Sequence, residues 1–192
     1  MPTPPDAAPV RVWDLPVRLL HWTLAAAVAA AWCTGEETLR WHEAAGFTAA
    51  GAVALRTAWG FCARGAVRFA SFVRSPAATW AYARTVLGGT EARYRGHNPL
   101  GGWMVVALLA TVAAACITGW LYTTDAFWGL AWLDLLHRGL AWAVLLLVPV
   151  HVAGVVLTGR RHRENLVAAM VIGRKRRGGA ETADAGDDPG RT

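Results

Sequence analysis

Four of the six histidines in this 192-residue chain lie within or at the ends of long apolar segments: His21, His42, His137 and His151. The imidazole nitrogens of histidine are common metal ligands. An ionisable residue inside an apolar span is costly and usually functional. A single such histidine would more often pack or hydrogen-bond than bind a ligand, so the spacing of the four decides what they can do.

His137 and His151 are 14 residues apart in one apolar segment. At about 100° per residue they return to within about 40° of the same helix face, and at about 1.5 Å per residue they are separated by about 21 Å. The first two apolar segments form a hairpin that repeats this arrangement. His21 comes early in the outgoing segment and His42 at the start of the returning one, so these two also lie near opposite membrane surfaces.

Four ligands can be paired in three ways, and only one pairing matches in depth. One iron cannot span the distance of about 21 Å between His137 and His151, and pairing His21 with His137 sets an inner ligand against an outer one. This leaves His21 with His151 and His42 with His137. Two opposed imidazoles suit the axial positions of a porphyrin iron, whereas zinc sites use three or four protein ligands. The chain contains no C-x-x-C pair, so the sequence does not indicate covalent heme attachment.

The elements that must position these histidines are membrane spans. The chain is 55% hydrophobic and only 17% charged, and its apolar runs have the length of about 20 residues that crosses a hydrocarbon core. We expect an all-α integral membrane protein, a four-transmembrane-helix bundle enclosing two b-type hemes, with spans at about 15–33, 41–62, 100–123 and 136–158. The Trp-rich stretch 124–135 predicts a short interfacial helix, and 63–99 a polar connection.

The distribution of Lys and Arg predicts the orientation. Most lie in the segments that precede the first span, join the second to the third, and follow the fourth. Both termini are therefore expected in the cytoplasm of a bacterium, with the bundle in its inner membrane. The same rule accounts for the net charge of +6, so no nucleic-acid partner is expected. We expect residues 1–11 to be a cytoplasmic tail, 12–177 the membrane domain and 178–192 disordered. Retention of the first span is favoured over its cleavage as a signal peptide.

Arg56 follows His42 by 14 residues in the second span and so repeats the same helix face one heme level further in. An arginine within a span needs an anionic partner, and a heme propionate would serve. Snorkelling of the side chain to the interface is an equal alternative.

At these residues the sequence resembles the bacterial cytochrome b561 and nickel-hydrogenase b-type cytochrome family. The matching stretches are VWDLPVRLLHW (12–22), HEAAGFTAAGAVALRTAWGF (42–61), GHNPLGGWMV (96–105), LLHRGLAWAVLLLVPVHVAGV (135–155) and HRENLVAAMVIGRKR (162–176). The resemblance implies two non-covalent b hemes, held by His21 with His151 on the cytoplasmic side and His42 with His137 on the periplasmic side. It also implies electron transfer between the quinone pool and a partner redox protein.

Related formate dehydrogenase cytochrome subunits bind a quinone at a comparable cytoplasmic loop. By that resemblance Asn98 and Gly101 could line a pocket for ubiquinone or menaquinone, although helix capping by Asn98 is the more common role of such a residue. His97 and His162 lie at the membrane boundary.

Three functions remain open. The first is a diheme electron carrier working with the quinone pool and a periplasmic c-type cytochrome. The second is the cytochrome b anchor subunit of a periplasmic hydrogenase or dehydrogenase, docked on an acidic outer face (Glu36, Glu37, Glu43, Asp125 and Asp134). The third is a transporter with histidine proton relays. Transporters often contain internal repeats, and the sequence shows none. Whether the chain forms a homodimer is left open.

Overall fold

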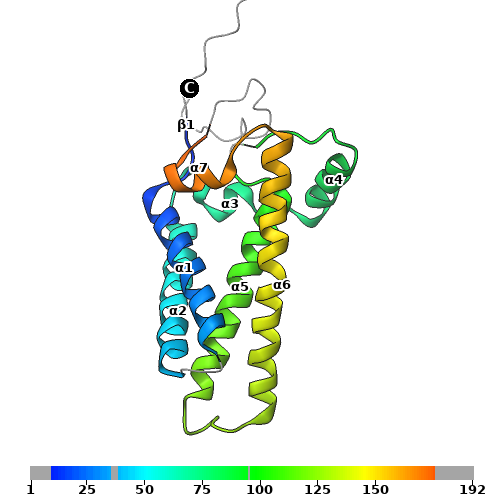
Figure 1. Ribbon diagram of the computed structural model, residues 1–192. Coiled ribbons are helices and arrows are strands. Elements are labelled where there is room, and N and C mark those ends of the chain that lie inside the picture. The colour runs from blue at the N-terminus through cyan, green and yellow to red at the C-terminus, as the bar shows by residue number, and fades with distance from the viewer. Residues whose placement is uncertain (1–9, 36–38, 95, 176–192) are drawn as a thin grey trace, which may run out of the picture.

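The computed structural model describes residues 10–35, 39–94 and 96–175. Four long helices run side by side (Figure 1): α1 (Leu15–Thr34), α2 (Leu39–Cys62), α5 (Pro99–Tyr122) and α6 (Ala131–Arg161). The short elements are η1 (Gly65–Val67), α3 (Phe69–Phe72), α4 (Pro76–Leu87), α7 (Leu166–Ile172), and the two strands β1 (Val10–Arg11) and β2 (Arg174–Lys175). The short elements gather at one end of the bundle, where β1 pairs antiparallel with β2. We call this the proximal end, and the other the distal end.

Side-chain caps begin four of the helices. Asp14 accepts a hydrogen bond from the Val17 backbone N–H at the start of α1, and Asn98 accepts one from Gly101 at the start of α5. Pro16 and Pro99 follow these caps in the first turn, where a missing N–H costs nothing. Ser75 and Asn165 cap α4 and α7 in the same way. The turns that open these helices are therefore readable in the sequence.

Two hydrogen bonds fix the antiparallel register of α1 and α2. His42 Nδ1 lies 2.8 Å from the Ala31 carbonyl oxygen, and Trp59 Nε1 donates to Asp14 Oδ2 at 2.8 Å. The two contacts are 17 residues apart on both helices. Along this register Arg56 lies opposite Val17, one turn on the proximal side of His21.

The buried core joins all four long helices. Its centre consists of Ala27, Ala49, Val53, Val112 and Val144. Val144 is seven residues from both His137 and His151, so this apolar layer lies midway between the two histidine levels. The outer surface of the bundle is also apolar, as a lipid-facing surface must be.

Within the described residues, three helices are long and apolar enough to cross a membrane: α1, α5 and α6. The helix α2 equals α5 in length, with 24 residues, but is less apolar because Arg40, Glu43 and Arg56 lie in it. It packs along both α1 and α5 and completes the four-helix bundle.

Two expectations about the connections are wrong. The stretch 124–135 is not a separate interfacial helix: residues up to Leu130 form turns, and α6 begins at Ala131, five residues before the expected span. Leu133 is fully buried, which holds this added turn against the bundle. The connection 63–99 is not simply a polar loop, because it folds into η1, α3 and α4. Of the predicted N-terminal tail 1–11, residues 1–9 lie outside the described residues and Val10–Arg11 form β1; the predicted tail 178–192 lies wholly outside the described residues.

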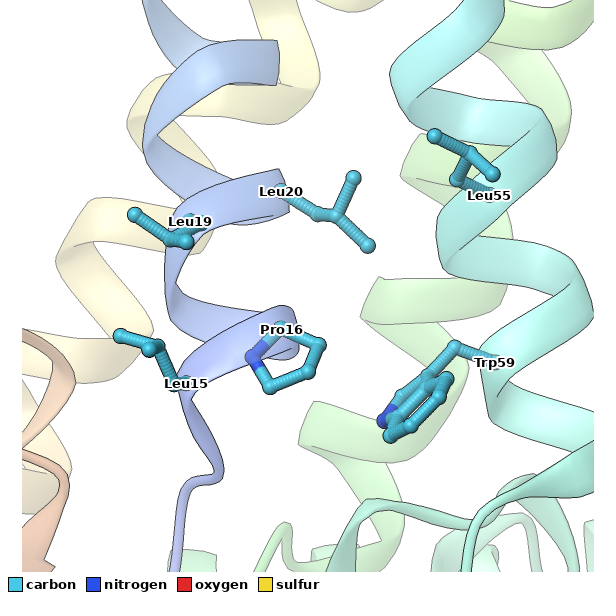
Figure 2. Close-up of a pocket in the computed structure, with 6 residues that line it drawn as sticks. All are labelled: Leu15, Pro16, Leu19, Leu20, Leu55 and Trp59. Carbon is cyan, nitrogen blue, oxygen red and sulfur yellow. The ribbon is translucent and has the colours of Figure 1, made fainter.

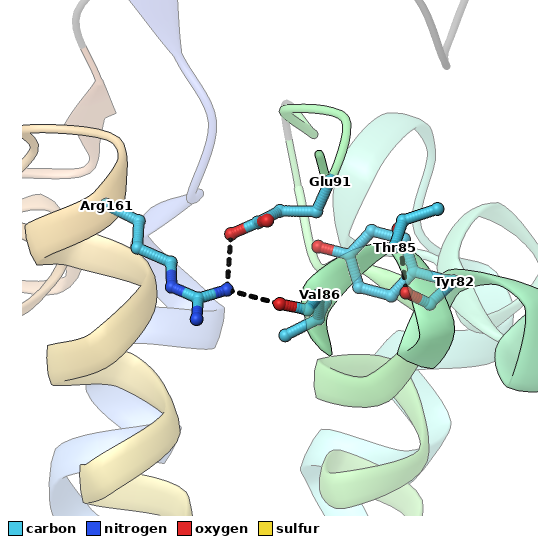
Figure 3. Close-up of polar contacts among 5 residues, drawn as sticks. All are labelled: Tyr82, Thr85, Val86, Glu91 and Arg161. Atoms are coloured by element: carbon cyan, nitrogen blue, oxygen red, sulfur yellow. Dashed lines mark hydrogen bonds and ion pairs between the residues drawn. The ribbon is translucent and has the colours of Figure 1, made fainter. Parts of the chain in front are cut away.

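The helix α4 is attached to the end of α6 by one arginine (Figure 3). Arg161 Nη1 donates to the Val86 carbonyl oxygen at 2.8 Å and to Glu91 Oε1 at 2.9 Å. The Arg161 guanidinium lowers the pKa of Glu91, and burial raises the pKa of the neighbouring Tyr82 to about 12. A second ion pair, Arg93 with Glu164, links the same connection to the segment before α7.

Candidate functional site

The structure brings the four span histidines together in two pairs. The ring centroids of His42 and His137 are 6.0 Å apart, and those of His21 and His151 are 6.4 Å apart. These are the pairs that depth matching predicts. We call the first the distal pair and the second the proximal pair. Each pair joins α6 to a helix of the α1–α2 hairpin, so the two pairs connect the two halves of the bundle.

Both histidines of the distal pair are oriented by backbone carbonyls. Nδ1 of His42 donates to the Ala31 oxygen at 2.8 Å, and Nδ1 of His137 donates to the Ala115 oxygen at 3.0 Å, with Thr118 Oγ1 at 3.2 Å. A histidine that ligates a metal generally donates its other ring N–H in this way, which fixes its tautomer and direction. These contacts leave Nε2 of both rings for a ligand.

Gly119 permits the close approach of α5 to His137. A Cβ built on Gly119 would lie 3.0 Å from Cε1 of the imidazole, tighter than nine in ten real Cβ contacts. A side chain here would press on the ring, so the absence of one at Gly119 accommodates the observed position of His137.

The proximal pair has a different setting. Arg56 is only 6% exposed, and its Nη1 has no hydrogen-bond partner among the described residues. Its Cζ lies 5.3 Å from the centre of the Phe69 ring. The arginine is therefore buried in the protein and does not snorkel to the interface.

A bis-histidine iron fits both pairs. Two imidazoles that share one metal through bonds of about 2 Å have ring centres about 6 Å apart, which is the separation that the structure shows. In the part of the chain described, no three His, Cys, Asp or Glu side chains gather as a metal cluster. The donor set therefore suits the two axial positions of a heme iron, and the unpartnered Arg56 suits its anionic propionates.

Asn98 and Gly101 are largely occupied by capping. Asn98 Oδ1 accepts the Gly101 N–H at 2.7 Å, which uses the polar groups that a quinone oxygen could have met there. The remaining Asn98 amide contacts the Tyr82 side chain. The role of both residues toward a quinone stays a prediction.

One open apolar groove runs along the outside of α1 and α2 (Figure 2). It is lined by Leu15, Pro16, Leu19, Leu20, Leu55 and Trp59. The leucines and the proline supply no polar side-chain group, and the indole N–H of Trp59 is already bonded to Asp14. The groove is therefore a lipid-facing surface and not a site for metal or headgroup chemistry.

Together the fold and the opposed histidines define a helical protein with membrane-span helices and two histidine pairs at two levels of the bundle. The model of the prokaryotic cytochrome b561 family matches residues 12–173, and the chain belongs to this family. It is thus a multi-pass membrane b-type cytochrome that transfers electrons and uses heme b; the family is one of four-helix diheme cytochromes. Searches of curated proteins and of solved structures gave no match.

Sequence reasoning assigned no role to His97 and did not find the partners of the distal histidines. His97 is packed between the rings of Trp13 and Phe72, at centroid distances of 4.7 and 4.8 Å. The signal in the sequence that could have indicated a role was the position of His97, directly before the Asn98 cap of a predicted helix. The carbonyls of Ala31 and Ala115 carry no sequence signal at all, because every residue has one.

Proposed function

We propose that this cytochrome carries electrons across the membrane between the quinone pool and a redox partner, with one heme b at each histidine pair. The observation that carries the proposal is the pair of opposed imidazoles at two levels of one bundle. The levels are about 21 Å apart along α6, by the rise of about 1.5 Å per residue. Heme b, when bound, supplies reversible one-electron chemistry.

The protein's residues hold and insulate these positions. His21, His42, His137 and His151 are the proposed axial ligands, and ligation by two histidines closes both axial positions to oxygen. The layer around Val53, Val112 and Val144 separates the two levels with apolar side chains. Such walls exclude water from the path between the sites.

We further propose that the proximal end faces the cytoplasm and receives the quinone. The excess of Lys and Arg in the segments at this end supports the orientation. For the quinone we keep the segment from Asn98 to Gly101, whose remaining polar group is the Asn98 amide beside Tyr82. Ubiquinone and menaquinone both fit this proposal, and a periplasmic c-type cytochrome or dehydrogenase would meet the distal end. As an anchor subunit of a periplasmic hydrogenase or dehydrogenase, the chain would use the same heme sites.

Single histidine substitutions test the heme assignment. His42→Ala and His137→Ala should each remove the same heme from the purified protein, identified by its midpoint potential, and leave the other in place. His21→Ala and His151→Ala should each remove the second heme. His162→Ala is the matched control and should retain both. A loss pattern that crossed the pairs, for example one shared by His21→Ala and His137→Ala, would contradict the proposal.

The substitution Asn98→Asp tests whether the Asn98 amide binds the quinone. Aspartate caps a helix as well as asparagine but lacks the amide N–H₂, so heme content should stay unchanged while heme reduction by added quinol slows several-fold. Asn165→Asp, the equivalent change at the cap of α7, should leave the rate unchanged. Equal rates in wild type and Asn98→Asp would exclude the Asn98 amide from quinone binding.

A further inference from the structure

Buried polar atoms without a hydrogen-bond partner gather at the proximal end. The buried side-chain nitrogen and oxygen atoms without a hydrogen-bond partner, within the described residues, are Arg18 Nε, Arg56 Nη1, Glu91 Oε2 and His97 Nδ1. None is near the distal pair. Three of the four are nitrogens, and buried polar groups normally have partners because leaving one unpaired costs about 1–3 kcal/mol. Such a group of nitrogens suits an anion that the described residues do not supply.

Arg56 and His97 flank the same aromatic cluster. The guanidinium of Arg56 lies over Phe69 at 5.3 Å, Phe69 contacts Phe72 at 5.7 Å, and Phe72 contacts His97 at 4.8 Å. The two polar side chains thus come from α2 and from the segment before α5, and each contacts one ring of α3. This aromatic cluster is an apolar support that contacts both side chains.

The two side chains also lie at the depth that an anion on the proximal heme requires. Arg56 is opposite Val17, four residues before His21, which corresponds to about 6 Å along the helix axis toward the proximal end. On the other side of the bundle, His97 lies just before the first residue of α5. Both are therefore beyond the proximal pair on the side away from the distal pair.

Within the described residues, no carboxylate accepts a hydrogen bond from Arg56 Nη1 or His97 Nδ1. Asp14 interacts electrostatically with Arg56, but its two oxygens already accept hydrogen bonds from the Val17 N–H and the Trp59 indole. In the part of the chain that the structure describes, no carboxylate compensates His97: burial, together with the charges of Lys175 and Arg56, lowers its pKa to about 3. A neutral His97 keeps one N–H to donate at pH 7.

We propose that Arg56 and His97 together bind the propionate carboxylates of the proximal heme, with Arg56 as the charged partner and His97 as the neutral donor. This rests on the proposed heme at the proximal pair. A buried guanidinium and a partly buried imidazole, each with a buried nitrogen that has no hydrogen-bond partner within the described residues, suit two carboxylates on one edge of a porphyrin. The distal heme has no equivalent among the described residues and keeps its propionates in another setting.

The test is a potentiometric titration of both hemes in the purified holoprotein. Removing a cation beside the propionates stabilises the more positive ferric state, so Arg56→Gln should lower the proximal midpoint potential. We expect about a tenfold change in the equilibrium constant, which is about 59 mV for one electron. Arg56→Lys keeps the positive charge and should therefore have a proximal midpoint potential close to that of the wild type. His97→Phe should shift the same potential downward by a smaller amount, and His97→Gln, which retains a donor, should shift it least.

Matched controls and a second readout keep the proposal falsifiable. Arg40→Gln and His162→Phe change the same residue types elsewhere and should leave both potentials unchanged. In heme labelled with ¹³C at its propionate carboxyls, redox-difference infrared bands of the proximal heme should move in Arg56→Gln and in His97→Phe. Unchanged bands and potentials, or equal shifts of the distal heme, would overturn this assignment alone. A wild-type protein without a proximal heme would overturn the proposed function itself.

Discussion

The distal and proximal histidine pairs have similar ring separations, yet the protein supports them by different means. At the distal pair, both imidazoles are held from behind by the carbonyl oxygens of Ala31 and Ala115. At the proximal pair no such bond is present within the described residues, and Arg56 and His97 lie nearby instead. One site therefore orients its histidines, while at the other we propose that Arg56 and His97 are partners for the edge of the cofactor. On this proposal, one bundle gives two chemically alike hemes different properties.

The largest expected effect comes from crowding the distal pair. Gly119→Val would place side-chain atoms against the His137 ring, where even a Cβ comes within 3.0 Å. We expect loss of most of the distal heme and retention of the proximal heme, measured as heme per chain. Gly139→Val is the control, since a Cβ there meets nothing within 4 Å. Retention of both hemes in Gly119→Val would show that binding of the distal heme does not depend on the observed position of the His137 ring.

A smaller effect should follow from uncapping α1 near the proximal pair. Asp14→Ala removes the cap of α1 and the acceptor of the Trp59 indole, which should lower the free energy of unfolding by about 1–2 kcal/mol. Because His21 lies two turns further along α1, the proximal heme should dissociate before the distal heme on heating. Ser75→Ala uncaps α4 and serves as the control. Simultaneous release of both hemes in Asp14→Ala would show that α1 does not favour the proximal site.

The attachment of α4 should be separable from both sites. Arg161→Met removes the bonds to Val86 and Glu91, so amide hydrogen exchange in residues 76–94 should increase while both hemes remain. The lowered pKa of Glu91 means that its contribution is complete above the ordinary value of 4.5 and is lost as the pH falls through the folded-state value. Wild type should therefore show the same increase in exchange only in acid. Arg160→Met is the control, and heme loss in Arg161→Met would tie α4 to the proximal site.

The smallest effect should come from Thr118→Val. The hydroxyl is one of two acceptors near His137 Nδ1, and the Ala115 carbonyl remains. Weaker hydrogen bonding makes the ligand less basic, so the distal midpoint potential should rise by less than about 59 mV, a tenfold change in equilibrium constant. The proximal potential should not move. If the proximal midpoint potential shifted more than the distal one, Thr118 would not act on the distal histidine pair as we propose.

The helical period explains what could be predicted from the sequence. A rise of about 1.5 Å and a turn of about 100° per residue place His137 and His151 on one face at two depths, and this requires no tertiary information. The caps at Asp14 and Asn98 are local signals of the same kind. By contrast, the burial of His97 between Trp13 and Phe72 depends on three segments far apart in the chain. The stretch 124–135 is predicted as a separate interfacial helix, whereas the structure has turns followed by the start of α6, because Trp128 and Trp132 mark an interface equally well in a turn or a helix.

The most direct test of the central claim is the amount of heme b per chain in the purified protein, measured from the reduced pyridine hemochrome spectrum. If iron is held between His21 and His151 and again between His42 and His137, the ratio is two, and reduced-minus-oxidised spectra show b-type bands. A ratio of one or zero in fully folded protein would contradict the account.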